Sequence, residues 1–148
     1  MRQGVESLPL HYSPILPSEA EIYPEYEEVK IDYKSLKEHM EGPNRPGHFE
    51  GVVTVINRFF ELLRPDRAYF GEKDFQQLAI IREFVEQKNW NIEIIGCPIV
   101  REENGLASSS RNMRLSQEGK NMASAVYKML SKVERESLIY SLGTAIER

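Results

Sequence analysis

Residues 67–97 are RAYFGEKDFQQLAIIREFVEQKNWNIEIIGC, and the clearest secondary-structure signals of the chain lie in this stretch. A strand-like run, Arg67–Phe70, precedes a turn at Gly71 and a helical segment over about residues 74–87 whose apolar positions are too many for a surface helix. Ile92–Cys97 then has the composition of a buried strand. Strand, helix and strand over about 30 residues is the size of a right-handed βαβ unit, so the sequence predicts an α/β fold with a parallel sheet.

Upstream of this stretch, a packed helix is predicted from about Glu50 to Leu63. Its apolar residues share one helical face: Val52, Val55, Ile56, Phe59, Phe60 and Leu63. Pro65 ends it, and the turn-rich residues 42–48 precede it as a loop. Before that loop we expect a short edge strand at Glu27–Ile31 and a short helix from about Tyr33 to Met40, capped by Asp32 and stopped by Gly42.

Downstream of Pro98 the character of the chain changes, which predicts a domain boundary near residues 98–100. Residues 101–116 are polar and rich in serine, and Glu102 and Glu103 are interpreted as solvated loop charges. A second amphipathic helix follows, with apolar residues at helical spacing: Met122, Ala125, Val126, Met129, Leu130 and Val133.

Composition excludes several classes of function. The 148 residues carry a formal charge of −4, so nucleic acid is not the expected partner, and no polybasic run suggests a membrane surface. Neither a signal peptide nor an apolar stretch long enough for a bilayer is evident. The single cysteine, Cys97, cannot form an internal disulfide and is interpreted as a packing residue, so we expect a soluble, cytoplasmic protein.

The first candidate site is Gly71-Glu72-Lys73-Asp74, between a predicted strand and a predicted helix. Ligands of open α/β sheets bind beyond the carboxyl ends of strands, where a helix N-terminus attracts anions. Gly71 allows close backbone approach and Lys73 supplies a cation. Gln77 follows in the same helix, where its amide could bind a hydroxyl or carboxylate of a small substrate. The structural alternative is a surface turn in which Asp74 and Gln77 form a capping box.

Two further segments are candidates. Ser108, Ser109, Ser110 and Arg111 could surround a polyphosphate, with Arg111 gripping two oxygens, although serine clusters are also common in plain loops. Arg45-Pro46-Gly47-His48 is a stiff loop that presents a cation and an imidazole, and His48 could bind a carboxylate or cap the following helix.

In this order, four motifs resemble those of pantothenate synthetases, the ATP-dependent pantoate–beta-alanine ligases. They are Pro17-Ser18 with Glu21-Ile22-Tyr23-Pro24, Glu41-Gly42 with Arg45-Pro46-Gly47-His48-Phe49, Phe70–Leu78, and Pro98–Glu102 with Gly105–Ala107 and Ser109–Asn112.

The resemblance implies a two-step reaction in which pantoate and ATP form pantoyl adenylate, and beta-alanine then displaces AMP. It implies a Rossmann-like nucleotide-binding domain, here residues 1–98, followed by the start of a smaller α+β lid domain, residues 99–148. It also implies Mg²⁺, without assigned protein ligands, and a cytoplasmic homodimer. Residues matched to the ATP site are Gly71, Glu72, Lys73, Asp74, Val100, Ser108, Ser109, Ser110 and Arg111.

Within that set, the resemblance places Lys73 on the ATP phosphates and makes Lys73 and Arg111 the catalytic candidates. Gln77 would bind pantoate, with Arg45 and His48 near the substrate end of the pocket.

The chain also departs from the family. The N-terminal His-x-Gly-His segment, whose histidines stabilise adenylate formation, is missing, as are the first strands, the second pantoate-binding glutamine and much of the C-terminal domain. Ser108 stands where the family commonly has methionine. We therefore expect a portion of a pantothenate synthetase that is inactive, or nearly so, by itself. The alternative is a non-catalytic structural or dimerisation domain that has kept this part of the fold.

Overall fold

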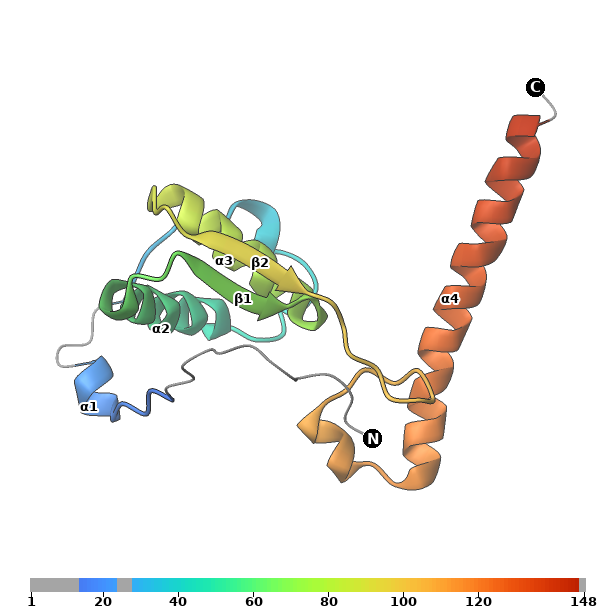
Figure 1. Cartoon of the computed structure of the whole chain (residues 1–148), viewed down its shortest axis with the longest axis horizontal. Helices are drawn as coiled ribbons and strands as arrows, with labels where there is room; N and C mark the ends of the chain where they lie inside the picture. Colours follow the sequence, from blue (N-terminus) through green and yellow to red (C-terminus); the bar gives the residue numbers. More distant parts are fainter. Residues whose placement is uncertain (1–13, 24–27, 147–148) are drawn as a thin grey trace, which may run out of the picture. The chain divides into compact units, whose positions relative to one another are not determined.

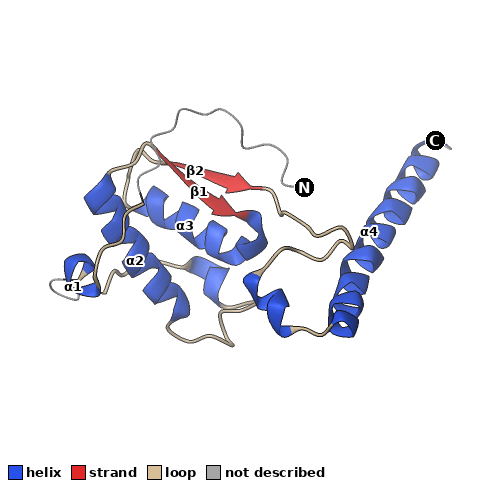
Figure 2. Cartoon of the chain, turned by 60° about the horizontal axis from the view of Figure 1, so that its bottom comes forward, coloured by secondary structure: helices blue, strands red, loops and turns tan. Residues whose placement is uncertain are grey.

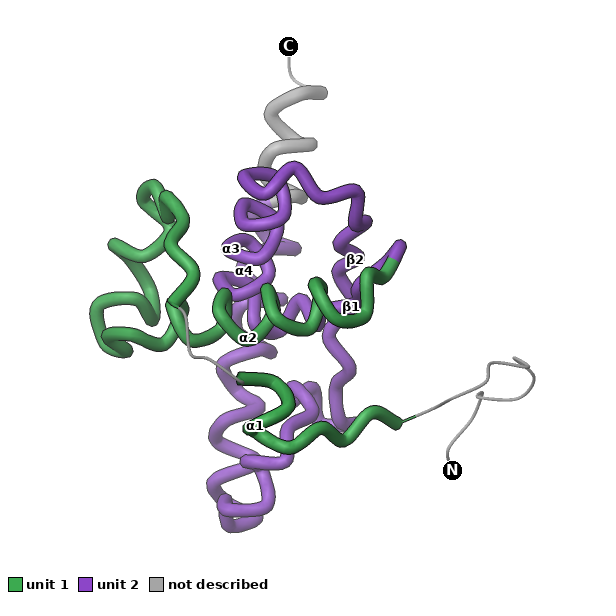
Figure 3. The backbone as a smooth tube through the Cα atoms, turned by 90° about the vertical axis from the view of Figure 1, so that its left-hand side faces the viewer, with its two compact units in different colours: residues 1–65 green, residues 66–148 purple. Residues whose placement is uncertain are grey.

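The computed structural model describes residues 14–23 and 28–146 (Figure 1). The chain divides into two compact units, residues 1–65 and residues 66–148 (Figure 3). The first unit contains α1 (Glu19–Ile22), the 3₁₀ turn η1 (Lys34–Lys37) and α2 (His48–Leu63). The second contains β1 (Arg67–Gly71), η2 (Glu72–Asp74), α3 (Phe75–Gln87), β2 (Glu93–Cys97), η3 (Ser110–Arg114) and α4 (Gln117–Ile146). The domain boundary near residues 98–100 stays a prediction.

The βαβ unit at the centre of the second unit is confirmed. β1 and β2 pair in parallel, from Arg67 opposite Glu93 to Gly71 opposite Cys97. α3 runs alongside this strand pair (Figure 2). Its inner face is buried through Leu78, Ile80, Ile81, Phe84 and Val85. The fold is therefore α/β, as the alternation of strand and helix predicted.

α2 begins and ends close to its predicted bounds, but its buried stripe differs from the expected face. The buried residues are Phe49, Val53, Thr54, Asn57 and Phe60, whereas Leu63 is 49% exposed. One reason is that the chain before η1 packs against the polar side of this stripe: the N–H of Val29 donates to Oγ1 of Thr54 at 3.3 Å. A buried hydroxyl with a partner is tolerated in a helix core.

The predicted edge strand at Glu27–Ile31 is wrong for the residues that the structure describes. Residues 28–33 have no strand partner, and Glu27 lies outside the described residues. The helix expected from Tyr33 to Met40 is shortened to η1, although Asp32 does accept a hydrogen bond from the N–H of Lys34 at 2.9 Å. Gly42 marks the following turn, where a Cβ would lie 1.9 Å from the carbonyl oxygen of Lys37, so only glycine fits.

The last helix of the chain, α4, extends well beyond the predicted segment. Its apolar residues have helical spacing as expected, yet Met122, Val126, Met129, Leu130 and Val133 are all exposed. Amphipathic spacing is a feature of sequence, and burial additionally requires a partner surface. No helix in the described part of the chain is long and apolar enough to cross a bilayer.

Candidate functional site

Two predicted site segments emerge from the same edge of the β1–β2 pair. Because the strands are parallel and Gly71 lies opposite Cys97, their carboxyl ends are level. η2 leaves β1 at this edge and leads directly into α3, while Pro98–Val100 leaves β2 there. This is the edge at which parallel α/β sheets bind ligands. The structure therefore brings the Gly71–Asp74 segment and the segment leading to Val100 to one place in the fold.

The N-terminus of α3 carries no side-chain cap. Asp74 is the N-cap residue by position, but its carboxylate accepts no capping hydrogen bond, so the predicted alternative of an Asp74–Gln77 capping box is wrong. Gln77 lies half-buried in the first turn of the helix. Lys73 is exposed and forms no ion pair with any residue that the structure describes. The first N–H groups of α3 and the Lys73 ammonium are the hydrogen-bond donors at this point, and the carboxylates of Glu72 and Asp74 flank Lys73 in the chain.

A tight hairpin returns the chain from Val100 to the serine-rich segment. The N–H of Ser108 donates to the carbonyl oxygen of Val100 at 2.8 Å, and Arg101 pairs with Ala107 in an antiparallel bridge. At its tip Gly105 has a φ of +92°, a left-handed conformation that glycine adopts without strain. Asn104-Gly105 is a common hairpin-turn sequence, and it was the signal by which this element could have been predicted.

The hairpin thus places Ser108 beside Val100, two residues that are eight positions apart in the sequence and that were both predicted to contact ATP. From Ser108 the chain enters η3, where Oγ of Ser109 accepts a hydrogen bond from the N–H of Arg111 at 3.2 Å. Ser108, Ser110 and Arg111 are exposed. Among the described residues, no hydrogen bond or ion pair joins this segment directly to Gly71–Asp74.

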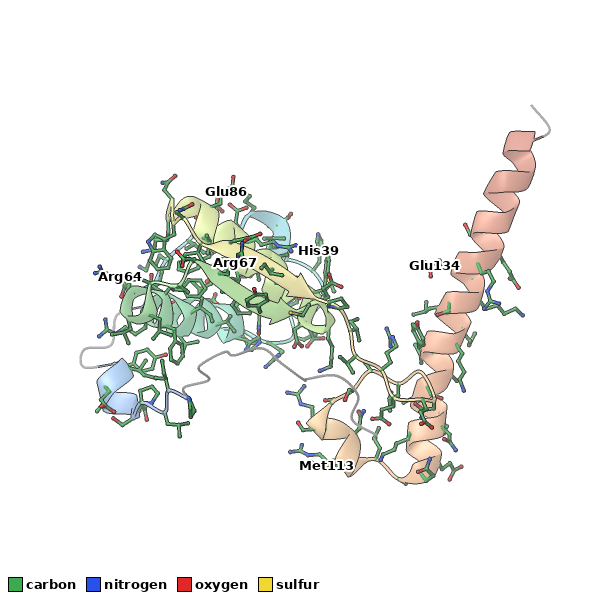
Figure 4. The ribbon with its side chains drawn as sticks, viewed as in Figure 1. His39, Arg64, Arg67, Glu86, Met113 and Glu134 are labelled. Carbon is green, nitrogen blue, oxygen red and sulfur yellow. The ribbon has the colours of Figure 1, made fainter. Side chains whose placement is uncertain are left out.

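Three contacts that the sequence did not indicate hold this hairpin in shape. The side-chain amide of Asn112 donates to Oε1 of Glu102 at 2.7 Å and to the carbonyl oxygen of Ala107 at 3.0 Å. The interpretation of Glu102 as a solvated loop charge is therefore wrong, while Glu103 is exposed as expected. On the other side, the Arg101 guanidinium stacks over the ring of Tyr127 on α4. Met113, labelled in Figure 4, lies in η3 and is largely exposed.

Arg45 and His48 belong to the first compact unit. Arg45 is exposed, and its carbonyl oxygen accepts a hydrogen bond from the N–H of His48 at 3.2 Å. His48 is the first residue of α2. The N-cap of α2 is Gly47, with a φ of +77° and no side-chain cap, so His48 does not cap the helix. Glu50 follows in the first turn, and its carboxyl has a lowered pKa because of its hydrogen bond to Lys37, with smaller contributions that include the charge of His48.

The parallel pair, the covering helix and the loops at one sheet edge define a part of a Rossmann-like α/β domain. The sequence matches the family described as pantoate-beta-alanine ligase over residues 12–147. The chain belongs to this family.

Relatives and solved structures agree with that assignment. The chain is 52% identical over 121 residues to the pantothenate synthetase of Cytophaga hutchinsonii, which covers 82% of this chain and 43% of that protein. It is 55% identical over 116 residues to the pantothenate synthetase of Bacteroides fragilis, covering 78% and 41%.

A crystal structure of pantothenate synthetase from Thermus thermophilus aligns with a TM-score of 0.70 at 47% identity, over 76% of this chain and 41% of that one. A Francisella tularensis pantoate-beta-alanine ligase, described as complexed with beta-gamma ATP and beta-alanine, aligns with a TM-score of 0.69 at 36% identity, covering 78% and 44%. The chain therefore spans about two fifths of the length of these proteins.

Proposed function

We propose that this chain is the part of a pantoate–beta-alanine ligase that holds ATP and contributes to the pantoate site. The observation that carries the proposal is the level carboxyl edge of β1 and β2, from which both candidate nucleotide-binding segments leave. The description of the family supplies two substrates, pantoate and beta-alanine, and the resemblance of the nucleotide-binding motifs supplies ATP. The name of the Francisella tularensis complex, which includes an ATP and beta-alanine, supports two of the three.

The reaction that we propose begins with attack of the pantoate carboxylate on the α-phosphate of ATP. This step forms pantoyl adenylate and releases pyrophosphate, and the amine of beta-alanine then attacks the acyl carbon and displaces AMP. Negative charge grows on the phosphates in the first step, so fixed cations aimed there lower its barrier. Lys73, just before the N-terminus of α3, and the exposed Arg111 are the residues assigned to this role.

The remaining candidates bind and orient the reactants. Gly71, Glu72 and Asp74 surround the nucleotide beside Lys73, and Val100 contacts the adenine. Ser108, Ser109 and Ser110 donate hydroxyl hydrogen bonds to the phosphates. Gln77 binds pantoate, with Arg45 and His48 toward the substrate end. Holding pantoate next to ATP supplies the orientation that a reaction between two bound molecules needs.

Mg²⁺ would accompany ATP in this proposal. The described residues contain no group of three or more His, Cys, Asp or Glu able to hold a metal ion. Mg²⁺ in such enzymes is commonly held by substrate phosphates and water with few carboxylates, so no step above depends on a protein-bound metal. The proposal also includes a homodimeric, cytoplasmic enzyme, and a nucleotide-binding domain that ends at residue 98 before a lid domain that begins at residue 99.

The direct test of the site is titration of ATP into the chain and its variants. Lys73→Ala and Arg111→Ala are expected to weaken binding at least about tenfold each, since each removes a charge-assisted hydrogen bond of roughly 1.5–3 kcal/mol. Lys88→Ala and Arg135→Ala remove exposed cations elsewhere and serve as charge-matched controls. Equal affinity in all four variants would contradict the assignment.

A second assay addresses activity. Pantothenate formation by the chain alone is expected to be undetectable, because it lacks the His-x-Gly-His segment associated with adenylate formation in the family. Turnover at an ordinary enzymatic rate would overturn this expectation. The alternative, a non-catalytic structural or dimerisation domain, predicts no ATP binding and a stable dimer, which the same titration and analytical ultracentrifugation would reveal.

A further inference from the structure

Gly96, one residue before the end of β2, lies at a crowded point of the second unit. A Cβ built on Gly96 would lie 3.1 Å from Oε1 and 3.2 Å from Cγ of Glu72, and 3.2 Å from Cδ2 of Leu78. Ordinary contacts between non-bonded heavy atoms are about 3.5–4.0 Å, so a side chain here would push its neighbours away. Glu72 belongs to η2 and Leu78 to α3, so the loop and the helix after β1 both approach the strand at this glycine.

We propose that Gly96 is a positioning residue for the Gly71–Asp74 segment. In the register of the sheet Gly96 lies opposite Phe70, two residues before Glu72. The bare backbone of Gly96 lets the Glu72 side chain lie across β2 immediately after β1 ends. Glu72, the first residue of η2, thus occupies the space that a side chain at residue 96 would need, and this close packing sets the direction in which Lys73 and Asp74 leave the sheet edge.

The contact has no substitute among the capping interactions of this loop. The η2 turn has no side-chain cap, and neither does the N-terminus of α3 that follows it. Gly71, at the start of the turn, is held by its pairing with Cys97 at the end of the sheet, and its own Cβ position meets nothing within 4 Å. Gly96 thus acts through Glu72 and need not touch the nucleotide itself. The inference rests on the proposed function only in expecting an effect of Gly96 on ATP affinity.

Gly96→Ala is expected to weaken ATP binding about three- to tenfold, because small displacements of positioning groups have large effects on bound geometry. In the nucleotide-free protein, Gly96→Ala should also displace the Gly71–Asp74 segment relative to its position in the unaltered chain. Changes in the backbone amide chemical shifts of Glu72–Phe75 would report this displacement. Gly51→Ala is the matched control: Gly51 is exposed on α2 and its Cβ position is open. This control should change neither readout.

A double-mutant cycle separates the two neighbours of Gly96. In a Glu72→Ala background, Gly96→Ala should lower ATP affinity less than about twofold further, since the group that it displaces is gone. An equal loss in both backgrounds would assign the effect to Leu78 and overturn the proposal, as would unchanged amide shifts at Glu72–Phe75 in Gly96→Ala.

The proposal stays testable if Gly96→Ala fails to fold or if the unaltered chain binds no ATP. Should Gly96→Ala unfold the chain, the Gly96→Ala/Leu78→Val variant removes the Leu78 Cδ2 contact while leaving that of Glu72, and the same amide shifts are expected in it. Should the unaltered chain bind no ATP, the proposed function fails, while the amide shifts of the variants still decide whether Gly96 positions the loop.

Discussion

Cζ of Arg101 lies 3.5 Å from the centroid of the Tyr127 ring, and the same guanidinium donates to the carbonyl oxygen of Gly105 at 3.1 Å. A Cβ on Gly105 would lie only 2.9 Å from Cδ1 of Tyr127. The ring of one α4 residue therefore packs on both the stem and the tip of the hairpin that carries Val100 and Ser108.

Replacing Tyr127 by Ala should loosen this hairpin. A cation–π contact is worth roughly 0.5–2 kcal/mol, so local opening becomes several-fold more frequent when the ring is removed. Hydrogen exchange of the Ser108 amide, which donates to Val100, measures this opening. Tyr127→Phe keeps the ring and should exchange like the unaltered chain; faster exchange in the Phe variant would show that the stacking is not responsible.

The Glu50 carboxylate should contribute to acid stability. Its pKa is lowered in the folded state, mainly by the hydrogen bond from Lys37, so the unfolded state binds more protons as the pH falls below the ordinary value of 4.5. The contribution is present above that pH and is lost as the pH falls through the folded-state pKa. Urea unfolding measures the free energy of unfolding at pH 7 and at pH 3. The difference between these two values should be smaller for Glu50→Gln than for the unaltered chain. Glu86→Gln, at an exposed position, is the control and should leave the difference unchanged.

The buried side chain of Tyr33 should make stability depend on pH in the alkaline range. Its hydroxyl is buried without a hydrogen-bond partner among the described residues, and burial raises its pKa from 10.0 to about 12. Between those values the unfolded state loses its proton first, so stability falls as the pH rises from about 10 to 12.

Tyr33→Phe should remove that fall. At pH 7 it should raise the free energy of unfolding by about 1 kcal/mol, since it deletes an unsatisfied polar group. The ring under Lys37 Nζ, 4.6 Å from its centroid, is kept. A marked loss of stability at pH 7 would show that the hydroxyl has a partner.

Two apolar residues of the second unit should respond very differently to truncation. Phe84 is fully buried in α3 and packs edge-on against Trp90, so Phe84→Ala should lower the free energy of unfolding by roughly 3–5 kcal/mol. Leu130 is 64% exposed on α4, and Leu130→Ala should change the free energy of unfolding by less than about 0.5 kcal/mol. Chemical denaturation of both variants measures the contrast, and a large loss in Leu130→Ala would mean that α4 is covered in solution.

The success of sequence reasoning varied along the chain for physical reasons. The βαβ unit was predictable because strand, turn and helix signals of residues 67–97 all agree with one local fold. The segment before η1 was not, because alternation near Val29 resembles an edge strand while its N–H instead binds Thr54 of a helix. That choice depends on a tertiary contact which no local pattern contains.

The candidate site shows the same division. Gly71–Asp74 could be located because a turn between strand and helix is a local signal, and the level ends of the strands place it where the sequence suggested. Gly96 could not be found, since its importance lies in how closely Glu72 and Leu78 approach it. The roles in ATP and pantoate binding assigned by resemblance to individual residues stay predictions.

The register of β1 and β2 indicates where a peptide can be inserted into the chain without disturbing the candidate site. Both candidate nucleotide-binding segments leave the carboxyl edge, whereas residues 88–92, which join α3 to β2, lie at the opposite edge. Arg67, labelled in Figure 4, lies at the start of β1 and marks that opposite edge. Its Nε lies 2.7 Å from Oε2 of Glu93. A reporter peptide inserted between Asn91 and Ile92 can therefore lengthen the chain on the side remote from the site, whereas the same insertion at residues 98–100 would separate its two halves.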